Sequence, residues 1–183
     1  DVAVVTFNWP CHGDDVKKKF SLEDCYTYLE LVTDHAKEQW KAEALYALAI
    51  SFGGYVLLNY IADRGDPFRK IVLRSPAIPM YQSFTGTIMK ADADAEQLDR
   101  GRDAMVGFDR KVPVSPAFLE EIRSADLTKR EFLDWADDLL IIHGTADEII
   151  PFEEIRAFAD NNVIALVPVE GADHRFQSPL KMA

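Results

Sequence analysis

The sequence predicts an α/β fold in which a mostly parallel sheet is covered by helices on both faces. Short, continuously apolar segments alternate along the chain with helical patterns. Continuous apolar strands are typical of parallel sheets because helices bury both faces of such strands. The chain has 183 residues, of which 48% are hydrophobic, so its length fits one domain with a buried core. We therefore expect a single α/β domain over residues 1–183.

The first predicted strand is VAVVTFNW at residues 2–9, which is rich in β-branched and aromatic side chains. A Pro-Cys-His-Gly-Asp-Asp loop follows it. Ser21 then stands three residues before Asp24, in the manner of a helix capping box. Apolar side chains at helical spacing predict one buried face for the helix that follows: Leu22, Cys25, Leu29, Val32 and Ala36.

Four further short apolar segments predict strands, at residues 45–50, 71–73, 139–142 and 163–167. A nearly all-apolar helix is expected at residues 54–62, and another helix is expected to begin at Pro151. Strands that alternate with helices in this way favour parallel pairing within one sheet.

Residues 79–134 break the alternation because they are charged and irregular, with short helical patterns such as residues 116–122. An insertion of this size between two strands is often a cap over a functional site. We therefore predict a cap insertion over about residues 79–134, with a surface excursion of no functional role as the alternative. Apolar side chains are interspersed near its start: Met80, Tyr81, Phe84, Ile88 and Met89.

Composition narrows the classes of partner. The net charge of -11 and the pI near 4.8 make nucleic acid and anionic membrane surfaces poor partners. No apolar stretch approaches the ~20 residues that a membrane span needs. Cys11 and Cys25 lack metal-type spacing, so we expect free thiols in a reducing, cytoplasmic compartment. Asp92, Asp94 and Glu96 alternate like a calcium loop but lack its glycine and terminal acid, which predicts a charged helix or loop. The acidic surface favours solubility and does not indicate an oligomeric state.

A serine followed by two glycines interrupts the apolar run ALAISFGGYVL at residues 47–57. A strand, then Ser-Phe-Gly-Gly, then a buried helix is the context of a nucleophile elbow, in which a strained turn points the serine outward. The usual pattern is Gly-x-Ser-x-Gly, and here Ala49 and Gly53 flank Ser51. Gly53 meets the demand for a small residue, whereas Ala49 adds a methyl group. A buried small residue at a strand end is the alternative explanation for the serine.

Two later loops carry an acid and a histidine. Asp147 lies in His-Gly-Thr-Ala-Asp-Glu-Ile-Ile-Pro after one predicted strand, and His174 lies in Gly-Ala-Asp-His-Arg-Phe after the last. Serine, acid and histidine in this chain order, each after a strand, are the arrangement of α/β-hydrolases. The chain resembles that family along essentially its whole length, including Cys-His-Gly-Asp-Asp, which is similar to the family's Gly-His-Gly-Asp-Ser loop. Among its branches, the sequence most resembles small bacterial esterases of the feruloyl/cinnamoyl-esterase-like group, some of which are peptidase-like.

The resemblance implies an α/β-hydrolase fold and a serine hydrolase that cleaves carboxylic esters of small acyl or aromatic groups. Ser51 would attack the carbonyl, His174 would act as general base, and Asp147 would orient the imidazole. The backbone N–H of Phe52 would donate to the oxyanion. This chemistry needs no metal and no organic cofactor, and its partner is a small-molecule ester. Candidate substrate contacts are His12, Met80 and Tyr81.

Alternatives remain for several roles. Asp173 or Glu148 could orient the imidazole in place of Asp147, although neighbours in sequence such as Asp173 and His174 rarely aim at each other. His143 is expected to be structural, and His35 to be solvated. Amide, lactone and acyl-transfer substrates belong to the same mechanistic class. A non-catalytic protein of this fold that binds a small ligand or partner is the second function class.

The resemblance also implies strands that the sequence does not contain. The family's first strands should precede Asp1, and one of them normally lies between the strands at residues 2–9 and 45–50 and supplies the second oxyanion-hole donor. The family usually has a closing helix beyond Ala183. We therefore expect the sequence to be a fragment of a longer protein, which also leaves the activity of this fragment to be tested.

Overall fold

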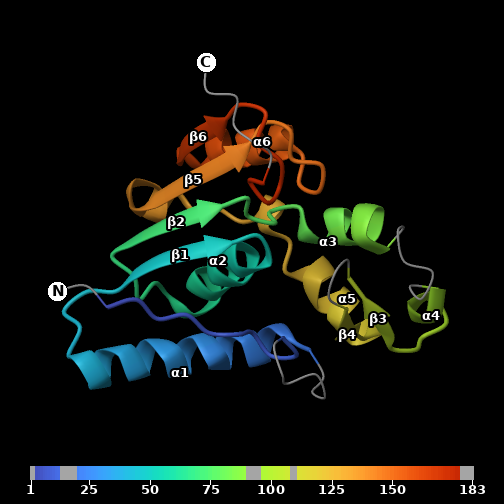
Figure 1. The fold of residues 1–183 in the computed structure, drawn as a ribbon, viewed down its shortest axis with the longest axis horizontal. Helices are drawn as coiled ribbons and strands as arrows, with labels where there is room; N and C mark the ends of the chain where they lie inside the picture. The colour runs from blue at the N-terminus through green and yellow to red at the C-terminus, as the bar shows by residue number, and fades with distance from the viewer. Residues whose placement is uncertain (1–2, 13–19, 90–95, 108–110, 178–183) are drawn as a thin grey trace.

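A four-stranded parallel sheet with strand order β1-β2-β5-β6 organises the molecule in the computed structural model (Figure 1). The structure describes residues 3–12, 20–89, 96–107 and 111–177. The strands lie where the apolar segments predicted them, and all three pairings are parallel. Their bounds are β1 (Tyr46–Ile50), β2 (Lys70–Arg74), β5 (Leu139–Gly144) and β6 (Ala165–Val169).

Three longer helices accompany the sheet: α1 (Leu22–Trp40), α2 (Phe52–Arg64) and α6 (Phe152–Asn162). The predicted cap of α1 is confirmed, because the side chain of Ser21 accepts a hydrogen bond from the backbone N–H of Asp24. Four of the five predicted core positions of α1 are buried and Val32 is half-buried, while Tyr26 and Thr33 are also buried. Helix α2 is buried almost throughout its first nine residues after Phe52, in agreement with its apolar sequence.

The segment at residues 3–9 is not a strand, which corrects the prediction for residues 2–9. Its β-branched residues favour an extended chain, but a strand also needs a neighbour that completes its hydrogen-bond ladder. Within the described part of the chain no strand pairs with it, and β1 pairs only with β2. Val4 is 84% exposed, whereas Trp9 at the end of the segment packs against the core.

The last strand begins two residues later than predicted. Val163 adopts a left-handed conformation (φ 57°) and ends α6, with its N–H bonded back to the carbonyls of Ala159 and Asp160. The helix cap therefore includes Val163, which the apolar pattern predicts to be in the strand, and β6 starts at Ala165.

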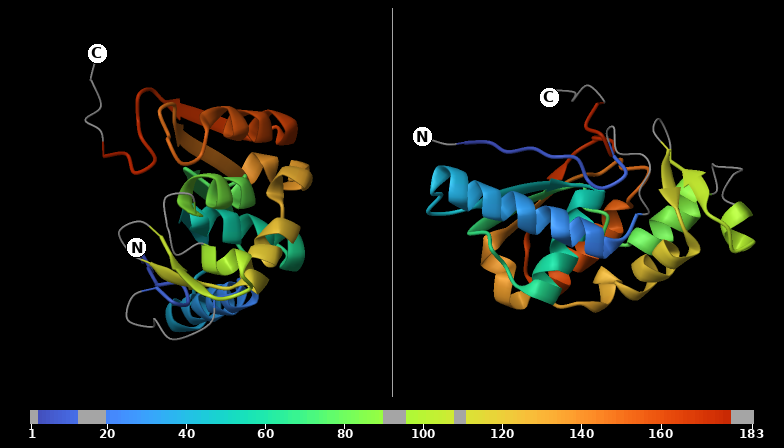
Figure 2. Two further views of the ribbon diagram at one scale, coloured as in Figure 1. Left: turned by 90° about the vertical axis from the view of Figure 1, so that its right-hand side faces the viewer. Right: turned by 90° about the horizontal axis from the view of Figure 1, so that it is seen from below.

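The elements from α3 (Met80–Ser83) to α5 (Pro116–Ser124) lie at one end of the molecule, beyond the carboxyl ends of β1 and β2, and the chain then returns to the start of β5 (Figures 1 and 2). The helix predicted at residues 116–122 is confirmed as α5 (Pro116–Ser124), which is capped by Ser115. Asp92 and Asp94 lie outside the described residues, and Glu96 begins α4. The division into a core and a cap at about residues 79–134 stays a prediction. The other elements are α3 (Met80–Ser83), η1 (Phe84–Ile88), α4 (Glu96–Asp99), the antiparallel pair β3 (Ala104–Val106) and β4 (Val112–Val114), η4 (Leu127–Lys129) and η5 (Leu133–Asp138).

Candidate active site

Ser51 occupies a strained turn between β1 and α2. Its backbone lies at φ 49° and ψ -116°, a conformation that residues other than glycine rarely adopt. Hydrogen bonds hold it there: the Ser51 N–H donates to the carbonyl of Arg74 at 3.0 Å, and the Ser51 carbonyl accepts from Gly54 and Ala77. The turn therefore has the geometry that the nucleophile-elbow pattern predicts.

The close approach of helix α2 to the neighbouring chain occurs at Gly54 rather than at Gly53. A Cβ on Gly54 would lie 2.9 Å from the Cβ of Pro76, which is closer than real contacts allow. A Cβ on Gly53 would lie 3.6 Å from the indole nitrogen of Trp9, an ordinary contact distance. The Gly-x-Ser-x-Gly pattern selects Gly53 because it depends only on spacing along the chain. The close contact is at Gly54 because Pro76, from another segment, packs there.

The side chains of Ser51, His174 and Asp147 lie together although three different loops carry them. His174 Nε2 is 2.9 Å from Ser51 Oγ, and His174 Nδ1 is 2.8 Å from Asp147 Oδ2. A carboxylate only accepts hydrogen bonds, so Nδ1 carries the proton and Nε2 accepts from the serine hydroxyl. Both Asp147 and His174 are buried.

Asp147 is held as an anion. Its Oδ1 accepts the backbone N–H groups of Ile149 at 2.9 Å and Ile150 at 2.8 Å. Burial alone would raise the pKa of Asp147, but the hydrogen bonds from His174 and from these two amides outweigh burial and keep that pKa below its ordinary value. A carboxylate that favours its charged form therefore faces the imidazole of His174.

The two competing acids, Asp173 and Glu148, bond main-chain groups of the histidine loop. Asp173 Oδ1 accepts the backbone N–H groups of Arg175 at 3.1 Å and Gln177 at 3.0 Å. Glu148 Oε2 lies 3.4 Å from the backbone nitrogen of His174, so it contacts the main chain and not the ring. Each of these carboxylates shapes the histidine loop.

Several residues that the sequence analysis did not select hold the loop that carries His174. The Ala172 carbonyl accepts the N–H of Ala146 at 3.1 Å, and the Gly171 N–H donates to Thr145 Oγ1 at 2.9 Å. The guanidinium of Arg74 lies 3.4 Å from the His174 carbonyl. Gly144 leaves no room for a side chain, because a Cβ there would lie 2.8 Å from the carbonyl carbon of Ala172.

No sequence pattern marks these contacts of the His174 loop, since each joins segments that are distant along the chain.

Comparison with known sequences identifies a family for this chain. The sequence model of the prolyl oligopeptidase family matches residues 7–181, nearly the whole chain. The chain belongs to the prolyl oligopeptidase family. No curated protein sequence matches this family member significantly.

Solved structures of α/β-hydrolase proteins are similar to this family member in fold. Est1E from Butyrivibrio proteoclasticus is 26% identical with a TM-score of 0.63, and the match covers 88% of this chain and 65% of Est1E. Est1E with ferulic acid bound is 25% identical with a TM-score of 0.65, covering 94% of this chain and 69% of that one. Monoacylglycerol lipase from Paleococcus ferrophilus is 19% identical with a TM-score of 0.63, and the match covers 92% of this chain and 73% of the lipase. The chain thus spans about two thirds of the length of these proteins.

Phe52 is the first residue of α2 in this family member. The first N–H groups of a helix have no partner within the helix, and among the described residues no hydrogen bond is donated by the Phe52 N–H. Its ring is half-buried, with its centroid 5.3 Å from that of Phe20. The predicted oxyanion role of Phe52 therefore stays a prediction that its position permits.

The three predicted substrate contacts lie on two segments. His12 Nδ1 is 2.9 Å from the carbonyl of Pro10, and the ring lies 5.6 Å from that of Phe20. Met80 is buried and Tyr81 half-buried on α3, beyond the carboxyl end of β2 in Figure 1. Contact of these side chains with a substrate stays a prediction.

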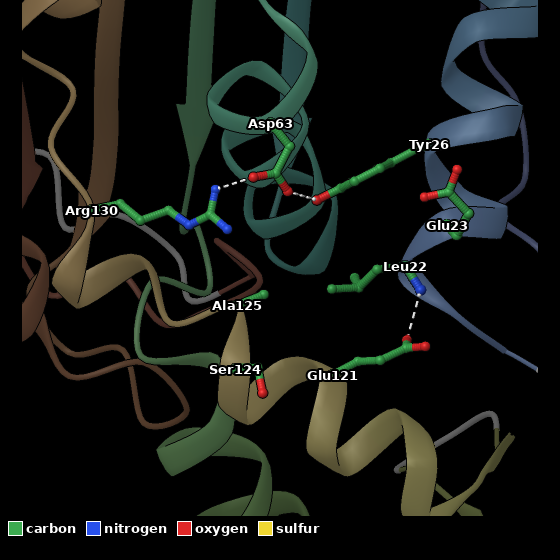
Figure 3. Close-up of a pocket in the computed structure, with 8 residues that line it drawn as sticks. All are labelled: Leu22, Glu23, Tyr26, Asp63, Glu121, Ser124, Ala125 and Arg130. Atoms are coloured by element: carbon green, nitrogen blue, oxygen red, sulfur yellow. Dashed lines mark hydrogen bonds and ion pairs between the residues drawn. The ribbon is translucent and has the colours of Figure 1, made fainter.

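A surface pocket of about 350 Å³ lies away from Ser51, between α1, the end of α2 and the end of α5 (Figure 3). Inside it, Asp63 accepts hydrogen bonds from Arg130 at 2.6 Å and from the Tyr26 hydroxyl at 3.0 Å. Glu121 accepts the first N–H of α1, from Leu22 at 3.0 Å. These contacts join α1 to the elements around it, and none involves the Ser51 site.

In the described ranges, no group of three or more His, Cys, Asp or Glu side chains is placed to hold a metal ion. Within those ranges also, no helix has the length and apolar character that crossing a membrane demands.

Proposed function

We propose that this chain is a serine hydrolase that cleaves carboxylic esters of small acyl or aromatic groups. One observation carries the proposal: the Ser51 hydroxyl, in a strained turn, hydrogen-bonds His174, which in turn hydrogen-bonds the buried carboxylate of Asp147. A nucleophile, a base and an orienting group within hydrogen-bond reach are the arrangement of activated serine chemistry.

The proposed reaction proceeds in two steps. Ser51 Oγ attacks the ester carbonyl while its proton passes to His174 Nε2, and the alcohol leaves with that proton. Water then attacks the acyl-enzyme, with His174 again taking a proton and returning it to Ser51. Asp147 keeps the Nδ1–H tautomer and stabilises the imidazolium that forms in each step.

The Phe52 N–H is proposed to stabilise the oxyanion. It is the first helical residue after Ser51, so the positive end of the α2 dipole adds to its effect on a developing negative charge. No step of this mechanism draws on a metal or an organic cofactor.

Two substrate classes have separate support. Est1E, 26% identical, has been solved with ferulic acid bound, which favours esters of aromatic acids. Membership of the prolyl oligopeptidase family favours peptide amides as the second candidate. We propose that His12, Met80 and Tyr81 contact the substrate beneath a cap at about residues 79–134, and that the protein acts in the cytoplasm on a small molecule.

The test is covalent labelling of this chain by a fluorophosphonate, followed by intact-mass spectrometry. We expect one adduct on the chain and none on Ser51→Ala, because only an activated serine reacts stoichiometrically. Absence of an adduct on chain that circular dichroism shows to be folded would contradict the proposal and favour a binding protein. Hydrolysis of aryl esters compared with that of peptide amides then separates the two substrate classes.

A further inference from the structure

His143 is fully buried at the end of β5, four residues before Asp147. Its Nε2 lies 3.0 Å from the carbonyl oxygen of Ile150 and 3.3 Å from Asp147 Oδ2. The same Oδ2 receives the Nδ1–H of His174 at 2.8 Å. Two imidazoles therefore meet one carboxylate oxygen.

The partners of His143 determine where its proton lies. Carbonyl and carboxylate oxygens only accept hydrogen bonds, so Nε2 must carry the proton. The other ring nitrogen, Nδ1, is buried and has no hydrogen-bond partner among the described residues. Burial lowers the pKa of His143, which agrees with a neutral ring that has a single N–H. The titratable groups that face this ring are Asp147 and His174.

We propose that His143 is a positioning residue for Asp147, acting through an Nε2–H that it shares between the Ile150 carbonyl and Asp147 Oδ2. The inference rests on the proposed function, because it concerns the group that orients the proposed base. With His143 included, two amide donors lie against Asp147 Oδ1, and two imidazole nitrogens lie against Oδ2, that of His174 at 2.8 Å and that of His143 at 3.3 Å. These donors fix the rotation of the carboxylate about its Cβ–Cγ bond.

The second imidazole also has an electrostatic consequence. A donor on Oδ2 takes up part of the negative charge that would otherwise hold a proton on His174. Without this donor, His174 stays protonated, and hence inactive as a base, up to a higher pH. Activity should then require a higher pH, whereas a purely structural histidine would change activity and stability at every pH alike.

The experiment compares His143→Gln with His143→Met. Glutamine carries its amide nitrogen near the place of the imidazole Nε2 and keeps a donor there, whereas methionine has a similar size and no donor. We expect the acid limb of the kcat/KM profile for an aryl ester to move up by about 0.5 of a pH unit in His143→Met. We also expect a fall of about 3- to 10-fold in kcat with little change in KM. In His143→Gln the limb should stay at its original position.

A second measurement does not depend on turnover. The proton NMR resonance of the His174 Nδ1–H should move further downfield in His143→Met and stay in place in His143→Gln, because the unshared carboxylate bonds that proton more strongly. If His143→Met does not fold, His143→Asn replaces it, since its shorter amide does not reach the Nε2 position. Thermal unfolding of each variant identifies the folded ones.

The outcomes separate this inference from the proposed function. Equal acid limbs and equal Nδ1–H resonances in the original chain and in the donor-free variant would overturn the role of His143, even with normal fluorophosphonate labelling. Lack of labelling in the original chain would overturn the proposed function, and the NMR comparison would still decide whether His143 acts on the Asp147–His174 pair. A shift in the donor-free variant alone supports the inference.

Discussion

Asp147 and Asp173 illustrate, at the scale of single residues, how hydrogen-bond donors divide the roles of two similar side chains. Asp147 is buried and accepts the His174 imidazole, whereas Asp173 accepts backbone amides of its own loop. Both carboxylates lie near His174 in the chain or in space, and their burial and their hydrogen-bond donors distinguish them. The substitution of each by asparagine therefore separates orientation of the imidazole from shaping of the loop.

Asp147→Asn is expected to lower kcat of ester hydrolysis by about 10³- to 10⁴-fold, because the amide favours the wrong tautomer of His174. Asp173→Asn should lower kcat by less than about 10-fold, since its oxygen can still accept from Arg175 and Gln177. Steady-state kinetics of both variants provide the check. A harmless Asp147→Asn combined with an inactive Asp173→Asn would reverse the assignment.

The buried ring of His143 predicts how stability depends on pH. An unfolded histidine takes up a proton near pH ~6.5, whereas burial holds the pKa of folded His143 lower. Below about pH 6.5 the unfolded state therefore binds more protons, and folding stability falls until the folded-state pKa is reached. Urea unfolding of the original chain and of His143→Gln over this range should show a stability difference that shrinks as pH falls. If the free energies of unfolding of the two proteins change with pH in parallel, His143 takes up its proton alike in the folded and unfolded states.

The β1–α2 connection shows, at the scale of elements, how one missing side chain sets the distance between a helix and its neighbours. Gly54 faces Pro76, which directly follows Ser75 after β2, so the helix can start only where a Cβ is absent. The carbonyl of Ser51 accepts the N–H of Ala77 in the same region. The segment at residues 76–77 thus both packs against Gly54 and bonds the strained backbone of Ser51.

Gly54→Ala is expected to destabilise the chain by about 1–3 kcal/mol, because the new methyl overlaps Pro76 and displaces the start of α2. The same shift should slow fluorophosphonate labelling of Ser51. Gly53→Ala is the matched control: its methyl meets only ordinary contacts, and alanine favours a helix by up to about 1 kcal/mol over glycine. Urea unfolding and labelling rates of both variants test the pair. Equal losses of stability and labelling rate in the two variants would show that overlap with Pro76 does not cause the effect of Gly54→Ala.

The whole molecule leaves apolar residues of the β1 strand in contact with solvent. Strand β1 is an edge strand, and its alternate residues Tyr46, Leu48 and Ile50 are 63%, 68% and 43% exposed. Parallel sheets are ordinarily covered on both faces, and exposed edge strands promote association between chains. These three side chains therefore form an exposed apolar row along the edge of the described sheet.

Leu48→Lys is expected to reduce concentration-dependent self-association of this chain while changing its free energy of unfolding by less than about 0.5 kcal/mol. The long side chain can extend into solvent from its 68% exposed position. Sedimentation velocity and urea unfolding provide the measurements. The comparison variant is Leu73→Lys, which places a charge at a fully buried position of β2 and should unfold the chain. Unchanged association of Leu48→Lys would mean that β1 is not the contact surface.

Local patterns were sufficient for most of the elements. The Ser21 cap, the apolar strands and the buried face of α1 follow from interactions within a few residues, which periodicity and capping rules describe. The strand predicted at residues 2–9 was wrong because strand formation depends on a partner that local sequence does not specify. The limits of α6 and β6 shifted because Val163 adopts a left-handed cap that its β-branched side chain argues against.

The sequence by itself determined the fold class, the resemblance to α/β-hydrolases and the selection of Ser51, Asp147 and His174 as candidates, because each of these depends on residue types at fixed places after strands. The tertiary structure alone decided which acid faces the imidazole, which glycine permits close packing, and that His143 shares a carboxylate oxygen with His174. These features depend on distances between segments far apart in the chain. Spacing along a sequence carries no such distances, because the backbone path between the segments sets them.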